Sequence, residues 1–348
     1  MFKKLLLGLL LISACVSPLY ATSEGEDSSL EIVKNEESTQ QDEPYFKVKP
    51  IVTLFEQFQQ GLGSESGYTS FEHHRGYVGL NIKARSGWHV SGIFDIVSTY
   101  PDSNDKLTFN AYLKNLELGW GIGNLSVVGG IIKTKNFELK ESYWGHRYVM
   151  SSFEDRYSFS SSADLGVTVE YKIGNVLSLD ASLTNGKGYR SIDLTGNYRY
   201  GFGATVKPFK DLVVRAFYDH YSSGDGDTPD QINPNQINTS LFVGYKLDKL
   251  DLGAEYNYMV NKSFVEGANA HGFSLYSTYH IFKWLNAFGR YDHRDTTDSS
   301  VFKSGNAFIF GAEFQPIKYI LVSPNFLFDK VAGSSCTSYF SINLSVNF

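Results

Sequence analysis

The sequence contains few cysteines, few prolines and no long apolar run after its first residues. Its 348 residues include only two cysteines, Cys15 and Cys336. Cys15 lies in the N-terminal leader, so the mature chain is expected to hold one thiol and no internal disulfide. No run of 18 apolar residues follows the leader and the mean hydropathy is -0.22, which excludes a membrane protein built from helices. Any membrane signal must therefore lie in the alternation of side chains.

An excess of positive charge is also absent. The formal net charge is -6 and the pI is about 5.8, whereas nucleic-acid binders usually carry a basic patch, so no nucleic-acid partner is expected. Aromatic residues and glycine are abundant, with 23 Tyr, 26 Phe and 32 Gly against 9 Pro. This bias is expected where rings form belts at membrane interfaces and glycines occupy strands and turns. The composition favours one large barrel over two soluble domains.

Residues 1–21 have the pattern of a secretory signal peptide. Lys3 and Lys4 precede the apolar run 5–12, which has the length of a signal-peptide core rather than of a membrane span. Export is therefore expected, with cleavage after Ala21. A second interpretation stays open, because Ile-Ser-Ala-Cys at 12–15 also resembles a lipobox, in which Cys15 becomes a lipidated N-terminus.

The stretch 22–44 is strongly acidic. It has one basic residue, Lys34, against eight acidic residues: Glu24, Glu26, Asp27, Glu31, Glu36, Glu37, Asp42 and Glu43. High charge with few apolar side chains does not supply a core, so the stretch is predicted to be a disordered tether. A short helix over 30–37 and a role as a periplasmic interaction segment are the alternatives.

From Tyr45 to Phe348 the chain repeats a strand, a short turn, a strand and a long polar loop. Seven short turns separate strand-like runs, at residues 85–87, 121–124, 173–175, 207–210, 248–249, 282–283 and 315–318. Eight longer loops rich in Gly, Ser, Asp and Asn lie between them, at residues 61–70, 100–107, 134–162, 185–196, 222–235, 262–270, 294–304 and 329–335. This order predicts an all-β fold over 45–348, a transmembrane antiparallel β-barrel of about 16 strands with short periplasmic turns and long external loops.

The last ten residues show the alternation most clearly. Apolar residues at 340, 342, 344, 346 and 348 alternate with small polar residues at 341, 343, 345 and 347, which predicts a strand between lipid and water. Closure of the barrel requires its free edge to pair with the first strand, residues 45–60. The terminal Phe348 looks like the end of a bacterial outer-membrane barrel, where the assembly machinery reads the final aromatic residue. Alternation fails past Lys114, which indicates a bulge.

Four motifs carry a family resemblance. They are Trp-Gly-His-Arg-Tyr at 144–148, Ser-Ser-Ala-Asp-Leu-Gly at 161–166, Asn-Gly-Lys-Gly-Tyr-Arg at 185–190 and Arg-Gly-Tyr-Val-Gly-Leu at 75–80. The chain resembles the outer-membrane porins typical of Bacteroidetes, which are related to the phosphate-selective porin O/P superfamily. The resemblance implies a 16-stranded diffusion channel in the outer membrane of a Gram-negative cell, surrounded by its lipids. It also implies that a homotrimer is a possible oligomeric state, because many such porins are trimers. An acidic residue is common in the family where this chain has Lys187, so neither charge selectivity nor phosphate specificity is carried over.

In such a channel, selectivity follows from charged side chains on the wall and from loops that narrow the lumen. The loop 134–162 is the longest, and we expect it to fold inward and form the constriction. The residues expected to line the pore or its constriction are Arg75, Lys83, Arg147, Arg156, Asp164, Glu170, Arg199, Arg215, Glu255, Arg290 and Glu313. Because arginines dominate at mid-height, a weak preference for anions is predicted. If these arginines pair with acids of the wall, the pore is instead unselective.

Catalytic and metal-binding patterns are not found in the sequence. The adjacent His73 and His74 face opposite sides of a strand, so neither a metal site nor a cofactor is expected. His220 and His293 each follow an aspartate but have no nucleophile context, so an enzyme is not expected. The predicted function is a passive diffusion channel for small hydrophilic solutes. The alternatives are a substrate-specific channel for anions or oligosaccharides, and a surface adhesin or recognition barrel.

Overall fold

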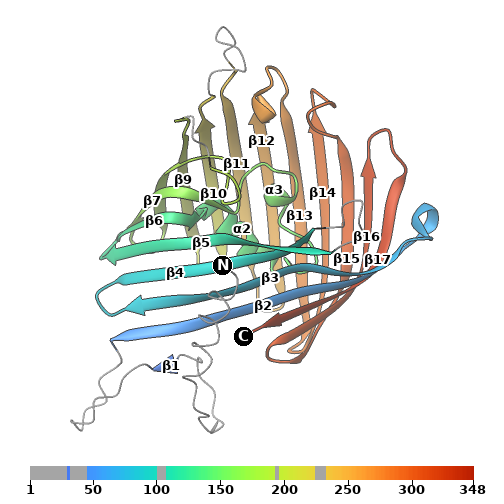
Figure 1. Ribbon diagram of the computed structural model, residues 1–348, viewed down its shortest axis with the longest axis horizontal. Coiled ribbons are helices and arrows are strands. Elements are labelled where there is room, and N and C mark those ends of the chain that lie inside the picture. The colour runs from blue at the N-terminus through green and yellow to red at the C-terminus, as the bar shows by residue number, and fades with distance from the viewer. Residues whose placement is uncertain (1–29, 32–44, 100–106, 193–195, 224–232) are drawn as a thin grey trace.

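The computed structural model describes residues 30–31, 45–99, 107–192, 196–223 and 233–348, and shows a closed barrel (Figure 1). Sixteen strands, β2 to β17, each pair antiparallel with the next strand along the chain. The last strand, β17, pairs with the first barrel strand, β2, from Tyr339 opposite Gly61 to Asn347 opposite Thr53. The predicted strand number and the predicted closure are therefore both confirmed. No helix in these ranges is long and apolar enough to cross a membrane.

The barrel strands run from eight to sixteen residues. Their bounds are β2 Phe46–Gly61, β3 Thr69–Ala84, β4 Trp88–Thr99, β5 Thr108–Ile122, β6 Leu125–Lys133, β7 Ala163–Ile173, β8 Leu177–Thr184, β9 Arg199–Phe209, β10 Leu212–Tyr221, β11 Gln236–Lys246, β12 Leu250–Val260, β13 Ala270–Phe282, β14 Leu285–Thr296, β15 Gly305–Ile317, β16 Ile320–Val331 and β17 Cys336–Asn347. Two short 3-10 turns, η1 (Gly63–Glu65) and η2 (Lys262–Phe264), lie in loops.

Short turns gather at one end of the barrel and long loops at the other, as predicted. The seven short turns hold two or three residues each, and β2 begins and β17 ends at this short-turn end. The predicted signal peptide and most of the predicted tether lie outside the described residues. Within the tether, Leu30–Glu31 form a two-residue strand, β1, that pairs antiparallel with Val48 and Lys47 of β2.

The alternation of side chains along the strands places polar residues on the side of the wall that faces the lumen. In β17, Ser341, Asn343 and Ser345 are almost fully buried on the inner side, whereas Ile342 is 39% exposed on the outer side. The predicted bulge is confirmed, because Ile93 pairs with Asn115 and Phe94 with Leu113, which leaves Lys114 without a partner on β4. The extra residue turns the Lys114 side chain into the lumen, where it is 7% exposed.

The third long loop, residues 134–162 (L3), folds into the barrel as predicted (Figure 1). It contains α2 (Lys135–Trp144) and α3 (Phe153–Arg156). Trp144 and Tyr148 of L3 pack in one apolar cluster with inward-facing residues of the far wall: Val213, Phe242, Tyr276, Phe288 and Ile309. The lumen is filled on this side, because the inner faces of β10, β11, β13, β14 and β15 supply apolar side chains that pack against the loop.

A buried ammonium group fixes α2 and α3 to the wall. The Nζ atom of Lys140 lies 2.6 Å from a carboxylate oxygen of Glu154 and 3.1 Å from one of Glu255 on β12. It also donates hydrogen bonds to Ser240 Oγ at 2.7 Å and Asn257 Oδ1 at 3.2 Å. Lys140, Glu154 and Glu255 are almost fully buried, so removing Lys140 leaves two carboxylates without their counter-charge, at a cost of about 3–5 kcal/mol.

The cluster has two carboxylates for one ammonium, and this affects the protonation of Glu154. Burial raises the pKa of the Glu154 carboxyl to about 7, Lys140 lowers it and Glu255 raises it further. Asp155, next along α3, also raises this pKa, and Asn136 donates a hydrogen bond of 2.6 Å to the carboxylate. The inserted loop therefore binds a proton more tightly than the unfolded chain does.

We expect the free energy of unfolding of the barrel to fall as pH rises from about 5 to about 8, because the Glu154 carboxyl loses its proton in this range. Its pKa is higher in the folded state, so its stabilising contribution is full below the ordinary pKa of Glu and is lost as pH rises through about 7. Thermal unfolding of wild type and Glu154→Gln across this range measures the effect. The variant should lose this part of the pH dependence. A wild-type dependence of the opposite sign, or one equal to that of the variant, contradicts the assignment.

Candidate functional site

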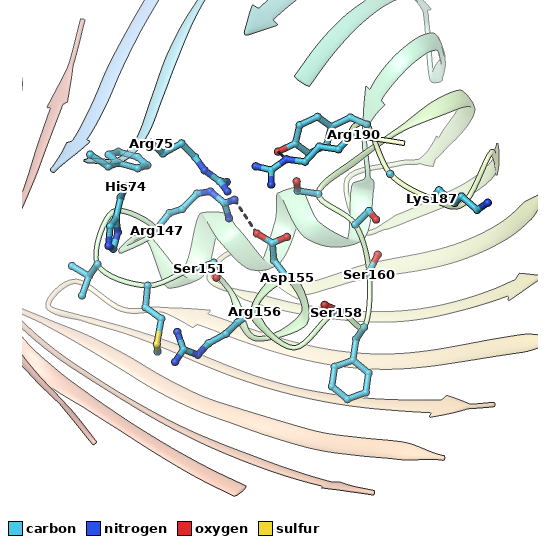
Figure 2. Close-up of a pocket in the computed structure, with 18 of the residues that line it drawn as sticks. His74, Arg75, Arg147, Ser151, Asp155, Arg156, Ser158, Ser160, Lys187 and Arg190 are labelled. Carbon is cyan, nitrogen blue, oxygen red and sulfur yellow. Dashed lines mark hydrogen bonds and ion pairs between the residues drawn. The ribbon is translucent and has the colours of Figure 1, made fainter. Parts of the chain in front are cut away.

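A cavity of about 560 Å³ lies between L3, the loop 185–198 and the strands β2, β3 and β9 (Figure 2). Its lining includes six lysines or arginines, namely Arg75, Arg147, Arg156, Lys187, Arg190 and Arg199. One carboxylate, Asp155, and five serines at 151, 158, 160, 161 and 162 also line it. The surface that a solute meets in this part of the lumen is therefore mainly cationic and hydroxylic.

Three cations converge on a single phenol oxygen at the base of this cavity. The Tyr77 hydroxyl accepts hydrogen bonds from Arg75 at 3.2 Å, Lys114 at 3.4 Å and Arg147 at 3.3 Å. These donors come from β3, from the β5 bulge and from L3. Lys114 forms no ion pair with a described carboxylate, and its ammonium lies against the rings of Tyr77 and two further aromatic residues, Phe137 and Tyr189. Arg75 and Arg147 also form ion pairs with carboxylates, so within this cluster the Lys114 ammonium is the cation that has no ion pair with a described carboxylate.

One carboxylate beside this cluster, that of Asp95, lies deeper than the arginines with which it pairs. Asp95 on β4 pairs with Arg75 at 3.4 Å and with Arg190 at 3.2 Å, and Tyr189 donates a further hydrogen bond to it. The Asp95 side chain is 0% exposed, whereas those of Arg75 and Arg190 are 24% and 41% exposed. One carboxylate thus pairs with two guanidinium groups, Arg75 and Arg190, which both line the cavity (Figure 2).

Two further ion pairs have the same orientation. Arg199 lies 3.7 Å from the fully buried Asp219, and Arg156 lies 3.1 Å from the less exposed Asp329. Arg147 is the exception, because it holds Glu141 at 2.9 Å and Asp155 at 2.8 Å, and both are at least as exposed as it is. Burial acts against the charge of Arg147, but Tyr77, Glu141 and Asp155 outweigh it and raise the guanidinium pKa. Arg147 is therefore charged at any physiological pH.

The predicted pore residues occupy four places. Arg75, Arg147, Arg156 and Arg199 line the cationic cavity. Glu170 and Arg215 line a second cavity, of about 630 Å³, between α2 and the short-turn ends of β7 to β10. Glu255, Arg290 and Glu313 are nearly buried and bind L3, through Lys140, the Ser151 carbonyl and the Tyr148 hydroxyl respectively. Of the last two, Asp164 has a structural position, because it accepts hydrogen bonds from the backbone N–H groups of residues 165 and 186. Lys83 lies away from both cavities, at the short-turn end of β3.

Several residues of the site were missed by sequence reasoning. Tyr77, Lys114, Lys187 and Arg190 are all absent from the predicted pore set, although each touches or lines the cavity or its base. The broken alternation at Lys114 was the available signal, because a bulge changes the direction of a side chain. Lys187 and Arg190 belong to the motif 185–190, which was read as a family likeness and not as part of the lumen.

Comparison with known proteins shows the fold and no sequence family. No family model matches the chain, and no curated protein sequence matches it. Among solved structures, outer-membrane expressed OmpT of Vibrio cholerae is 12% identical over 88% of this chain and 99% of that one, with a TM-score of 0.62. The outer membrane channel DcaP of Acinetobacter baumannii is 13% identical over 87% of this chain and 97% of that one, with a TM-score of 0.62. Salmonella typhi OmpF, in complex with daunomycin, is 12% identical over 87% of this chain and 98% of that one, with a TM-score of 0.66. The chain therefore has the fold of outer-membrane porins and channels.

Proposed function

We propose that this protein is a porin of the cell outer membrane, through which small hydrophilic solutes diffuse passively, with a weak preference for anions. The observation that carries the proposal is the cationic cavity beside the inserted loop, with six lysines or arginines and one carboxylate in its lining. The porin fold supports the location and the channel, and the charge of the lining supports the preference. The solute gradient supplies the driving force, so the proposal includes neither a cofactor nor catalysis.

Ion pairing of the lumen arginines limits how strongly the channel prefers anions over cations. The guanidinium groups of Arg75, Arg156 and Arg199 have carboxylate partners, and paired charges produce a weaker field than free ones. The acids nevertheless lie deeper than the arginines, so each pair presents its positive end to the solute. Lys114 adds a charge that no described carboxylate balances. The resemblance to Bacteroidetes-type porins related to the phosphate-selective superfamily remains part of the proposal, but it adds nothing about the charge of the lumen.

Ion-selectivity measurements on purified protein in planar bilayers test the function. We expect stepwise channels with a reversal potential that corresponds to an anion permeability about threefold above that of cations, equivalent to about 0.6 kcal/mol. A clear cation preference contradicts the charge assignment. Conductance that saturates or is blocked by one solute favours a substrate-specific channel for anions or oligosaccharides. Complete absence of channels favours an adhesin or recognition barrel.

Arg190 is a suitable position for testing the charge of the cavity. It is the more exposed of the two arginines that pair with Asp95, which keeps Arg75 and Tyr189 as partners when Arg190 is neutralised. We expect Arg190→Gln to lower the anion-to-cation permeability ratio by about twofold, because it removes one lumen charge within a Debye length of the permeating ion. Lys330→Gln is the matched control, because Lys330 is an exposed residue on the outer face of β16. Equal shifts in both variants would refute a local effect.

We further propose that the barrel assembles as a homotrimer and is recognised during assembly through Phe348. A Vibrio cholerae OmpT structure is described as a trimer form. On the outer face of this barrel, Glu56 of β2 lies 2.7 Å from the His73 ring, and that ring packs on Phe109. A carboxylate on a wall that faces lipid is energetically unfavourable. A neighbouring copy of the barrel over this face would remove Glu56 from lipid, which supports the proposed trimer. Phe348 is 62% exposed and stacks on Tyr319, which leaves it accessible.

The oligomeric state tests the trimer directly. We expect native mass spectrometry in detergent to give three times the mass of the mature chain. Glu56→Arg should shift the population toward monomer, because three copies then bring positive charge together beside His73. Glu65→Arg, a change of the same charge in the external η1 turn, serves as the control. A wild-type monomer, or a trimer unaffected by Glu56→Arg, contradicts the proposed interface.

A further inference from the structure

The short-turn end of the barrel carries a ring of positive charge. The three strand residues next to each short turn, together with the first three residues of β2, include one carboxylate, Asp251, and five lysines: Lys47, Lys83, Lys172, Lys207 and Lys246. The turns add two carboxylates, Asp211 and Asp248, and five cations: Arg85, Lys210, Lys249, Lys283 and Lys318. Residues 45–348 contain 28 basic and 29 acidic residues in all, so the barrel is almost neutral and this excess is local. We call these residues the basic rim.

Two of the rim lysines are placed directly against each other. Lys47 on β2 pairs in register with Lys83 on β3. Both point into the lumen, because they keep the phase of inward-facing residues on their strands, Phe55 and Tyr77. Like charges that are directly opposite on neighbouring strands destabilise a sheet. A counter-charge over this pair therefore stabilises the start of the barrel.

The acidic stretch 22–44 enters the barrel at this same place. It carries eight carboxylates and one lysine, and it continues directly into Tyr45 and β2. Its net charge of -7 is opposite in sign to the excess of positive side chains on the rim. Attraction between the two is intramolecular, so a short connection gives a high effective concentration.

The edge of β2 provides a backbone contact for the same stretch. β17 pairs with β2 from Gly61 down to Thr53, and Phe348 continues the pairing to Val52, so residues 46–51 have β3 on one edge and no C-terminal partner on the other. β1 pairs with Val48 and Lys47 in this section and places Glu31 in register with Lys47. An open strand edge is a template for strand addition, and the acidic stretch supplies the strand.

The length of the stretch is sufficient to reach across the rim. Sixteen strands about 4.8 Å apart and tilted by about 40° enclose a barrel about 30 Å wide. The 23 residues from 22 to 44 extend to about 75 Å at most. We propose that the acidic stretch 22–44 binds the basic rim of its own barrel, with Glu31 beside Lys47, and neutralises the periplasmic mouth of the lumen. This contact lowers the anion preference that the rim would otherwise add.

Distances between two spin labels test the contact without any channel recording. Labels are attached at Ser38→Cys and at Asn175→Cys, in the turn after β7, in a Cys336→Ser background. At about 20 mM salt we expect a short, narrow distance distribution, and at about 1 M salt, where the Debye length is about 3 Å, a broad and longer one. Lys47→Gln, Lys83→Gln, Lys172→Gln and Lys207→Gln combined should give the broad distribution at both salt concentrations. Identical distributions in wild type and this variant would overturn the proposal.

A second variant leaves the barrel residues unchanged, in case the lysine substitutions impair folding. Glu24→Gln, Glu26→Gln, Asp27→Asn, Glu36→Gln and Glu37→Gln should also broaden the distribution at low salt. The control neutralises two lysines at the opposite end, Lys303→Gln and Lys330→Gln, and should keep the wild-type distances. If the acidic variant retains the short distance, charge does not hold the stretch and the proposal fails. Failure of the porin function leaves these distances unaffected, so the two proposals fail separately.

Discussion

The lumen of this barrel depends on one buried ammonium group. Lys140 joins α2 to α3 through Glu154 and joins both to the wall through Glu255. The loop that carries these helices also brings Arg147 and Arg156 to the cationic cavity. Charge in a dry interior is favourable only when every partner is in place, so L3 has a single well-defined position. The shape of the pore and the charge of its narrow part thus have a common origin.

The sign of the lumen follows from depth rather than from composition. Arginines and acids are almost balanced around the cavity, and a count of charges gives little net field. Asp95 and Asp219 are fully buried, while the guanidinium groups that they bind reach the surface of the lumen. A solute therefore meets the positive ends of these pairs first, whereas the acids that pair with Arg147 are at least as exposed as it is. This arrangement requires long, flexible cations and short acids, which is why arginine and aspartate form these pairs.

The sequence was sufficient to predict the architecture of the barrel but not the residues that form the cationic cavity. Strand number, turn positions and the inward loop follow from a period of two, from turn residues and from loop length, which are all local signals. The inward direction of Phe242, Tyr276 and Phe288 does not follow from them, because alternation shows that two faces differ and not which one binds a loop. The cluster at Tyr77 joins residues from two strands and L3, so only the closed barrel brings its members together.

The partners of L3 lie later in the chain than the loop itself. Lys140 requires Ser240, Glu255 and Asn257, and Trp144 packs on residues of β13 and β14. The apolar cluster and the buried ammonium group thus join L3 mainly to the C-terminal half of the wall, whereas Arg147 joins it to β3. The loop therefore links the two halves of the barrel across the lumen as well as narrowing it.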